Sequence, residues 1–192
     1  MKNNLSNLMS ALDDYLFEVS SIQNITSAKT SVNASRIPSL FSNKIFLREC
    51  SNFVFDFGCG SYTKHIESYL LKHGVFYLPF DLYNRTFIEN QTSLLTLYEL
   101  IAKGMHFSFT CSNVLNVIQD DDIIKKIISI SSLFDERFFT VYEGDRTGTG
   151  RCTKSDCYQR NQKISDYLDF FPNTPFYCDS KIIYDFENSL PF

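Results

Sequence analysis

Tryptophan is absent from this 192-residue sequence, and glycine, proline and histidine are scarce, with seven, five and three residues. The aromatic content comes instead from nineteen phenylalanines and eleven tyrosines, so we expect a core built mainly on Phe, Ile and Leu. Hydrophobic residues make up 44% of the chain and charged residues 21%, as in ordinary globular proteins. This length is sufficient for one domain with a full core.

None of the six cysteines belongs to a CxxC pair, so neither a zinc ribbon nor a thioredoxin-type redox site is indicated, and we expect no metal centre. The first residues, MKNNLSNLMSALDDYLF, carry two acids and lack the apolar core of a signal peptide. No apolar run is long enough to span a membrane. These absences predict a cytoplasmic protein with reduced thiols and no membrane or metal partner.

The net charge is −4, whereas a free-standing binder of duplex nucleic acid must neutralise several phosphates. Basic residues are nevertheless concentrated locally. Residues 146–163 contain five Lys or Arg residues and one Asp, a local net charge of +4. Tyr158 lies among these charges, which suits the binding of phosphate and the stacking of a base. A solvated loop is the alternative interpretation.

Apolar residues spaced by three and four predict a helix over residues 5–20, and a stretch rich in Ser, Thr and Asn predicts a loop that ends at Pro38. Strands and helices then alternate. Apolar runs predict strands, and the stretches between them predict helices: strands over 53–57, 75–80, 106–111 and 137–142, and helices over 63–73, 92–102 and 120–134. A charged loop and helix over 144–170 and a hairpin over 176–186 complete the expected order.

The alternation predicts an α/β fold with a doubly wound, mostly parallel sheet and right-handed crossovers. In such sheets, ligands bind beyond the carboxyl ends of the strands, at the point where the strand order reverses. Four polar residues end or closely follow predicted strands: Asp56, Asp81, Asn113 and Glu143. We therefore expect their side chains to gather along one edge of the sheet.

The stretch around Asp56 carries two glycines, Gly58 and Gly60, which let the backbone approach a ligand closely, and the next helix offers N–H groups. Asp81, at the end of the next strand, is placed to accept the hydroxyls of a ribose. Dinucleotide-binding proteins have a third glycine where Thr63 stands and an apolar residue in place of Asp56, so pyrophosphate binding is disfavoured. An acid at this position instead suits a ligand with a positive charge, such as the ammonium of an amino acid.

Three stretches, VFDFGCGSYT (54–63), PFDLYN (79–84) and FTCSNVLNVI (109–118), resemble the cofactor-binding motifs of class I S-adenosylmethionine-dependent methyltransferases. TSVNASRIP, NVLNVI and VYEGD…GRCTK…YQRN together also resemble uncharacterised methyltransferase-like proteins of bacteria and phages. The resemblance implies a Rossmann-like methyltransferase fold with S-adenosylmethionine as the cofactor. It implies nine cofactor-binding residues: Asp56, Gly58, Cys59 and Gly60 at the methionine and ribose, Asp81 at the ribose, Leu82 at the adenine, and Ser112, Asn113 and Val114 at the sulfonium.

Two features depart from the family pattern. Tyr62 stands at the usual third glycine of the first motif, and only one helix fits between the second and third predicted strands. The strand that carries the acid for the adenine amine is therefore missing, which predicts a sheet shortened by one strand. By this resemblance the chain is one domain with three parts: an N-terminal helical and lid segment (1–50, with KTSVN as the lid), a cofactor-binding core (51–145) and an acceptor side (146–192).

The resemblance implies methyl transfer to a small-molecule or nucleic-acid-related acceptor. The residues expected to contact the acceptor lie after the fourth predicted strand: Arg151, Lys154, Tyr158 and Arg160. Glu143 and Asp145 are candidates for a catalytic base, whereas His106 starts a strand at the wrong end. A Pro-Pro-Tyr-like tetrapeptide after the third strand and a Pro-Cys pair are both absent, so the ordinary nucleic-acid base methyltransferases are disfavoured.

Other interpretations stay open at this point. Asp56 and the glycines also suit a tight strand–helix turn without a ligand, Asp81 a solvated strand end, and Asn113 a partner of buried backbone. A non-catalytic protein that keeps the fold and binds the cofactor is the main functional alternative, favoured by Tyr62 and the missing strand. A nicotinamide or flavin oxidoreductase is a third hypothesis, disfavoured by Thr63.

Overall fold

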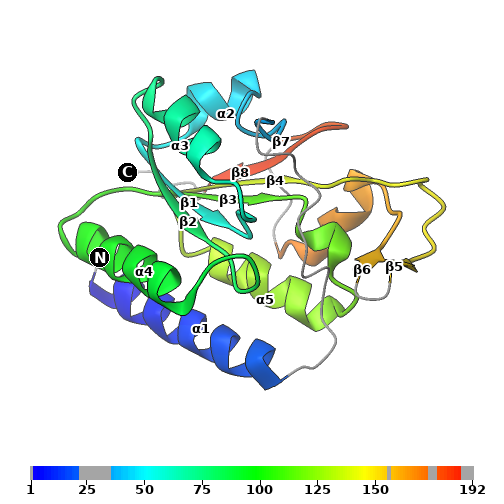
Figure 1. Ribbon diagram of the computed structural model, residues 1–192, viewed down its shortest axis with the longest axis horizontal. Coiled ribbons are helices and arrows are strands. Elements are labelled where there is room, and N and C mark those ends of the chain that lie inside the picture. The colour runs from blue at the N-terminus through cyan, green and yellow to red at the C-terminus, as the bar shows by residue number, and fades with distance from the viewer. Residues whose placement is uncertain (1, 22–35, 155–156, 173–176, 187–192) are drawn as a thin grey trace.

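A six-stranded mixed sheet forms the centre of the computed structural model, which describes residues 2–21, 36–154, 157–172 and 177–186 (Figure 1). Its strand order is β2-β1-β3-β4-β8-β7. The strands are β1 (Phe53–Phe57), β2 (Phe76–Phe80), β3 (Ser108–Ser112), β4 (Glu136–Thr140), β7 (Tyr177–Cys178) and β8 (Ile183–Phe186). The first four are parallel, and β8 pairs antiparallel with both β4 and β7. The predicted α/β class with a mostly parallel sheet is confirmed, as is the terminal hairpin.

Helices cover both faces of the sheet in Figure 1: α1 (Lys2–Ser21), α4 (Phe87–Ala102) and α5 (Asp121–Ser131) one face, and α2 (Lys44–Glu49) and α3 (Lys64–Leu71) the other. Successive residues of a strand point to opposite faces. Phe55 of β1 therefore belongs to the core cluster that contains residues of α1, α4 and α5, whereas its neighbour Val54 belongs to the cluster with Phe46 of α2 and Leu70 of α3. This arrangement explains why the strands read as continuous apolar runs.

The larger core is built on phenylalanine, as the composition predicts. The Phe55 ring stacks on that of Phe134 with the centroids 5.7 Å apart, and the Phe57 ring stacks on those of Phe80 and Phe109 at 5.3 Å and 5.6 Å. These residues come from three neighbouring strands and from the segment before β4. Their contacts fix the strand ends that carry the polar residues described below.

The strand order reverses beside β1, because β2 pairs with one edge of β1 and β3 with the other. The parallel part of the sheet therefore has its switch point between β1 and β3, the place where doubly wound sheets bind ligands. β2 is an edge strand of the sheet, and α4 is the only helix or strand between β2 and β3 in the chain. The expectation of one helix and no further strand in this interval is correct.

Helix α4 begins at Phe87 rather than at Thr92, where the apolar pattern placed its start. Thr86 and Glu89 form a capping box: the Glu89 amide donates to Thr86 Oγ1 at 3.3 Å, and the Thr86 amide donates to Glu89 Oε2 at 2.8 Å. The Thr-x-x-Glu spacing was visible in the sequence and sets the true start of the helix.

The largest correction concerns residues 144–170, where the sequence predicted a loop and a helix. The chain forms a two-stranded hairpin, β5 (Arg151–Lys154) with β6 (Cys157–Gln159), and then the 3-10 helix η2 (Ile164–Phe170). Gly144, Gly148 and Asn161 adopt positive φ angles of 62°, 75° and 57°, which an α-helix cannot accommodate. In the part of the chain that the structure describes, no helix is long and apolar enough to cross a membrane.

Candidate functional site

A cavity of about 920 Å³ opens at the carboxyl ends of the parallel strands, at the switch point. Its size suits a small organic ligand or cofactor, for which cavities of roughly 300–1,000 Å³ are usual. All nine residues predicted to bind a cofactor line it: Asp56, Gly58, Cys59, Gly60, Asp81, Leu82, Ser112, Asn113 and Val114. The structure thus brings together three segments that are far apart in the sequence.

Asp56, the fourth residue of β1, places a buried carboxylate at the edge of this cavity. Its side chain is 2% exposed and accepts hydrogen bonds from the Tyr77 hydroxyl at 2.5 Å and the Thr110 hydroxyl at 2.8 Å. Burial raises the pKa of Asp56 to about 6, although the two hydrogen bonds oppose the shift. Both hydrogen-bond partners are neutral hydroxyls, so neither of them supplies a positive charge to stabilise the carboxylate. A positively charged ligand group next to Asp56 would therefore favour the ionised form of this residue.

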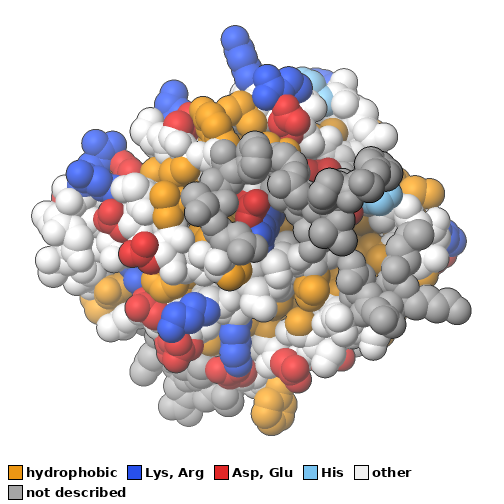
Figure 2. Space-filling model, turned by 180° about the vertical axis from the view of Figure 1, so that it is seen from behind, with side chains coloured by type: hydrophobic (Ala, Val, Ile, Leu, Met, Phe, Trp, Pro, Cys, Tyr) orange, Lys and Arg blue, Asp and Glu red, His pale blue; other side chains and the backbone are white. Residues whose placement is uncertain are grey.

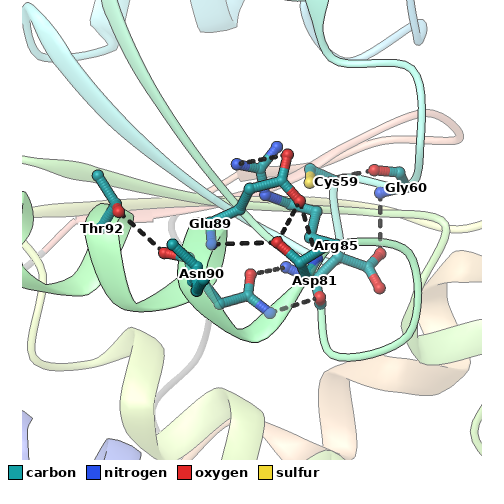
Figure 3. A network of polar contacts seen from close by, with 9 residues as sticks. Cys59, Gly60, Asp81, Arg85, Glu89, Asn90 and Thr92 are labelled. Atoms are coloured by element: carbon teal, nitrogen blue, oxygen red, sulfur yellow. Dashed lines mark hydrogen bonds and ion pairs between the residues drawn. The ribbon is translucent and has the colours of Figure 1, made fainter.

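Asp81 follows β2 and organises two turns of the protein itself. Its Oδ1 accepts from the amides of Tyr83 and Asn84 at 2.8 Å and 2.9 Å and from Asn84 Nδ2 at 3.1 Å, while Oδ2 accepts from the Gly60 amide at 2.8 Å. Asn90 of α4 holds the Asp81 backbone from the other side (Figure 3). Each carboxylate oxygen has about two acceptor positions, and Oδ2 accepts only the Gly60 amide, so one position on Oδ2 remains for a ligand hydroxyl.

The backbone amides of the glycine turn are already occupied. The amides of Gly58 and Cys59 both donate to the Phe80 carbonyl, at 2.8 Å and 3.2 Å, and the Gly60 amide donates to Asp81. These three residues therefore offer no open N–H group to a ligand. These three amides cannot cradle a phosphate, and the acidic floor of the cavity suits a neutral or positively charged ligand.

Gly58 also has a packing role. Its φ angle is 80°, and a Cβ atom built on it would lie 2.3 Å from Cγ2 of Val114. Only glycine lets the turn after β1 approach the segment after β3 so closely. Gly58 therefore has a structural role in a tight turn, and this role is compatible with ligand binding because the contact brings two of the predicted motifs together.

Asn113 directly follows β3 and has a φ angle of 58°, which is unusual for a residue with a side chain. Its amide is held by the Thr140 carbonyl at 2.8 Å. The side chain lines the cavity, is exposed, and makes no hydrogen bond to any residue that the structure describes. Asn113 is therefore not a partner of buried backbone, and its amide group is open to a ligand. Strained conformations of this kind are concentrated at ligand sites.

The residues predicted to contact the acceptor do not all line the cavity. Arg151 and Tyr158, both on the β5–β6 hairpin, line the cavity, as does Asp145. Arg151 Nη2 lies 3.4 Å from Asp145 Oδ2. Hydrogen bonds from the hydroxyl and amide of Thr147 lower the pKa of Asp145, so this carboxylate is a weak proton acceptor. A Cβ atom on Gly150 would lie 1.7 Å from the Tyr158 hydroxyl, so the hairpin also depends on a close approach.

Arg160 does not reach the cavity, which corrects its predicted role. It is 7% exposed, donates to the carbonyls of Ile118 and Gln119 at 2.6 Å and 2.8 Å, and pairs with Asp121. Its guanidinium also lies over the Phe170 ring, 5.8 Å from the centroid. Arg160 therefore holds the hairpin to the start of α5 and is a structural residue.

Glu143 is likewise engaged within the protein and does not line the cavity. It accepts the amide of Ile164 at 2.8 Å and pairs with Arg146 at 2.6 Å, which anchors the loop and leaves it unsuited to act as a base. His106 lies at the opposite end of the sheet, 3.1 Å from Asp135. The Lys154 side chain and the KTSVN lid (29–33) lie outside the described residues.

The thiols of Cys59 and Cys111 are not candidates for a nucleophile. Burial raises the pKa of both well above the usual value, and the neighbouring carboxylate of Asp56 adds to the shift. A thiol that stays protonated at neutral pH is a weak nucleophile. Glu143 and Asp145 are engaged in ion pairs as well. The main chemical capacity that remains to the site is therefore to position a ligand.

Sequence reasoning named Tyr62 and Tyr158 but missed the other tyrosines of the cavity wall and the amide network of the cavity. Several tyrosines line the cavity, at the mouth and deeper: Tyr15, Tyr62, Tyr83, Tyr142 and Tyr158. Asn116 Nδ2 donates to Gln159 Oε1 at 3.1 Å, and Gln159 Nε2 donates to the Tyr142 carbonyl at 2.8 Å. The rule that found the acids, polar groups just after strands, also finds Tyr62, Tyr83 and Tyr142. The amide network has no comparable sequence signal.

No protein-family model matches the chain, and no curated protein matches it either. Within the described residues, no three His, Cys, Asp or Glu side chains are grouped in a way that would hold a metal ion. The fold and site therefore define a class and no more: an α/β protein with a mostly parallel, doubly wound sheet and a ligand-sized cavity at its switch point.

Proposed function

We propose that this protein is an S-adenosylmethionine-dependent methyltransferase with a small-molecule acceptor. The observation that carries the proposal is that all nine motif residues, from three separate segments, line one cavity at the switch point of the sheet. A shared fold alone would not justify this step, because one fold hosts many functions. The argument rests on the chemistry of the cavity floor.

The cofactor side of the cavity matches a charged nucleoside better than a dinucleotide. Asp56 offers a buried carboxylate without a basic partner, which suits the ammonium and sulfonium charges. The open position on Asp81 Oδ2 suits one ribose hydroxyl. The occupied amides of Gly58, Cys59 and Gly60 disfavour a pyrophosphate. The nicotinamide and flavin hypotheses lose support for the same reason.

The bound cofactor would supply an activated methyl carbon, and the residues of this chain would align an acceptor with it. Asn113 and Val114 line the same cavity as Arg151 and Tyr158 of the hairpin. Alignment alone can lower a barrier by about 7–11 kcal/mol in favourable cases. Since Glu143 and Asp145 are engaged in ion pairs, the acceptor is expected to have a nucleophile that needs no strong base.

The local basic stretch is largely neutralised, which favours a small acceptor over a nucleic acid. Arg146 pairs with Glu143, Arg151 with Asp145, and Arg160 with Asp121. Acidic and basic side chains are also interspersed on the face drawn in Figure 2. A nucleic-acid interface would require a continuous basic surface.

Isothermal titration calorimetry with S-adenosylmethionine and S-adenosylhomocysteine tests the cofactor. Saturable binding of both in the micromolar range is expected. The absence of binding at millimolar cofactor, by a protein shown to be folded, would overturn the proposal.

A non-catalytic cofactor-binding protein is the second candidate, favoured by the engagement of both candidate bases, Glu143 and Asp145. It predicts binding in the same titration but no transfer. Incubation with methyl-labelled cofactor and a small-molecule extract distinguishes the two hypotheses. Label in any product supports the enzyme, and binding without label supports the second candidate.

A further inference from the structure

A second cavity, of about 360 Å³, lies beside the first, between the start of α3 and the start of α4. Lys64 and His65 of α3 line it, as do Arg85 and Glu89. Tyr62 lines both cavities and so stands between them. None of the basic residues here belongs to the site described above.

Arg85 is the unusual residue of this cavity. Its side chain is 14% exposed, and its Nε atom is buried with no hydrogen-bond partner in the part of the chain that the structure describes. A guanidinium N–H donor that is left unpaired in a buried position is unfavourable. In Figure 3, the guanidinium of Arg85 lies beside the carboxylate of Glu89.

Glu89 does not satisfy Arg85. Its Oε1 is 3.9 Å from Arg85 Nη2, beyond hydrogen-bond distance, and its Oε2 accepts the amide and hydroxyl of Thr86, each at 2.8 Å. The acid is therefore committed to capping α4. Arg85 is left with a weak ion pair and a buried, unpaired Nε–H donor.

The remaining charges of the cavity are basic. Lys64 and His65 are exposed, and neither forms an ion pair with any described residue. Two cationic side chains and an imidazole therefore face one carboxylate. The hydrogen-bond donors, the charge and the volume all fit a small, multiply charged oxyanion, and arginine pairs with phosphate through two parallel hydrogen bonds.

We propose that this second cavity binds the phosphate group of a small phosphorylated ligand, with Arg85 as the principal contact and Lys64 and His65 in support. Tyr62 then separates the phosphate from a ring held in the first cavity, where its own ring offers a stacking surface. The inference does not rest on methyl transfer, since it stands on Arg85 and its surroundings. The proposed anion site thus lies after the glycine turn, at residues 61–65 and 84–89, and does not use the amides of the turn, which are occupied.

Nuclear magnetic resonance with inorganic phosphate as the probe tests the site directly. The Arg85 Nε–Hε signal, assigned by its loss in Arg85→Met, is expected to shift on titration together with the amides of residues 61–65. Arg85→Met should weaken phosphate binding by about tenfold or more, as expected for the loss of charge-assisted hydrogen bonds. Lys103→Gln is the matched control, because Lys103 pairs with Glu99 near the other end of α4, and it should bind phosphate unchanged.

Equal phosphate affinity in the wild type and Arg85→Met would overturn the proposal, and so would shifts that spread evenly over the surface lysines. A parallel titration separates the sources of the phosphate. Adenosine monophosphate should bind more tightly than inorganic phosphate if its ring enters the first cavity, and adenosine should not perturb Arg85. Tighter binding of phosphate alone would identify a free anion as the ligand and would overturn the inference of a phosphorylated molecule.

Thermal unfolding supplies an independent readout. Met keeps the aliphatic packing of Arg85 and removes the unpaired donor, so the Tm of the ligand-free variant should be equal to or higher than that of the wild type. Phosphate should raise the Tm of the wild type and not that of the variant. A lower Tm of the ligand-free variant would show that the guanidinium is satisfied within the protein and would overturn the proposal. The calorimetric titration with S-adenosylmethionine is unaffected by either outcome.

Discussion

The two halves of the main cavity are built differently. On the side of β1 and β2, the functional groups end strands and are held by the sheet: Asp56 bonds to hydroxyls of two neighbouring strands, and Asp81 binds the turns on either side of it. On the other side, Arg151 and Tyr158 stand on a short hairpin outside the sheet. The first half is held in place by hydrogen bonds within the protein, and the second half stands on a hairpin outside the sheet. Under the proposed function, the first half would bind the cofactor and the second half would contact the acceptor.

Gly58→Ala should have the largest effect, because it breaks the contact between the motifs of the first half. The change combines a strained φ with a contact of 2.3 Å to Val114, and we expect a loss of about 4 kcal/mol of unfolding free energy together with the cofactor site. Urea denaturation measures it. Gly104→Ala is the matched control: its φ is 83° but nothing lies within 4 Å, so about 1 kcal/mol is expected.

The double variant Gly58→Ala with Val114→Ala separates strain from collision. If the collision dominates, removing the Val114 methyl groups recovers more than about 1 kcal/mol of the loss, as coupled neighbours should. Additive effects of the two changes would show that Val114 is not the obstacle and would contradict the packing role of Gly58.

Arg160 and Arg151 sharpen the comparison within the second half. Arg160→Met removes two hydrogen bonds to carbonyls and an ion pair with Asp121, whose side chain is 58% exposed. It should cost about 2 kcal/mol of unfolding free energy, mainly because the two carbonyls lose their partner. Arg151→Met affects a side chain that is 64% exposed, and its effect on stability should stay within about 0.5 kcal/mol. Chemical denaturation of both variants checks the contrast. Similar losses in the two would mean that the hairpin is not organised as described.

The sequence predicted the first half well and the second half poorly, for a physical reason. Asp56, Asp81 and Asn113 end or follow buried apolar strands, and parallel strands necessarily bring their carboxyl ends to one edge. The hairpin depends on positive φ at Gly144, Gly148 and Asn161 and on tertiary contacts of Arg160, none of which leaves a periodic pattern. The hydrogen bonds that occupy Asp81 and the glycine turn were likewise not predictable from local sequence.

Asp56→Asn should separate stability from binding within the first half. The folded pKa of about 6 lies above the value of 3.8 for a free aspartate, so this group's contribution to stability is complete below pH of about 4 and is lost as the pH rises through 6. At pH 7.5 the variant should therefore be more stable than the wild type, by about 3 kcal/mol at most. Thr110 can accept from the new amide and donate to the Phe55 carbonyl, 3.5 Å away.

The same variant should bind S-adenosylmethionine at least about tenfold more weakly, since it lacks the charge that faces the ligand. Wild-type affinity should rise as the pH increases through 6, and that of the variant should not. Unfolding at several pH values and calorimetry check both statements. A variant that is less stable at pH 7.5 and unchanged in affinity would contradict the account of Asp56.

Asp145→Asn should have the smallest effect. Its carboxylate is held ionised by Thr147 and pairs with Arg151, so we expect a change in kcat of less than about threefold. Steady-state kinetics with an identified acceptor measure it. A loss of about a hundredfold or more, with an acid limb in the pH profile that the variant lacks, would instead identify Asp145 as a general base.

A crystal structure of the protein grown with saturating S-adenosylhomocysteine tests the central claim most directly. The account predicts density in the main cavity, with the amino group of the ligand near Asp56 and one ribose hydroxyl on Oδ2 of Asp81. Density for the ligand elsewhere, or a main cavity filled by protein side chains with Asp56 turned away from it, would contradict the account.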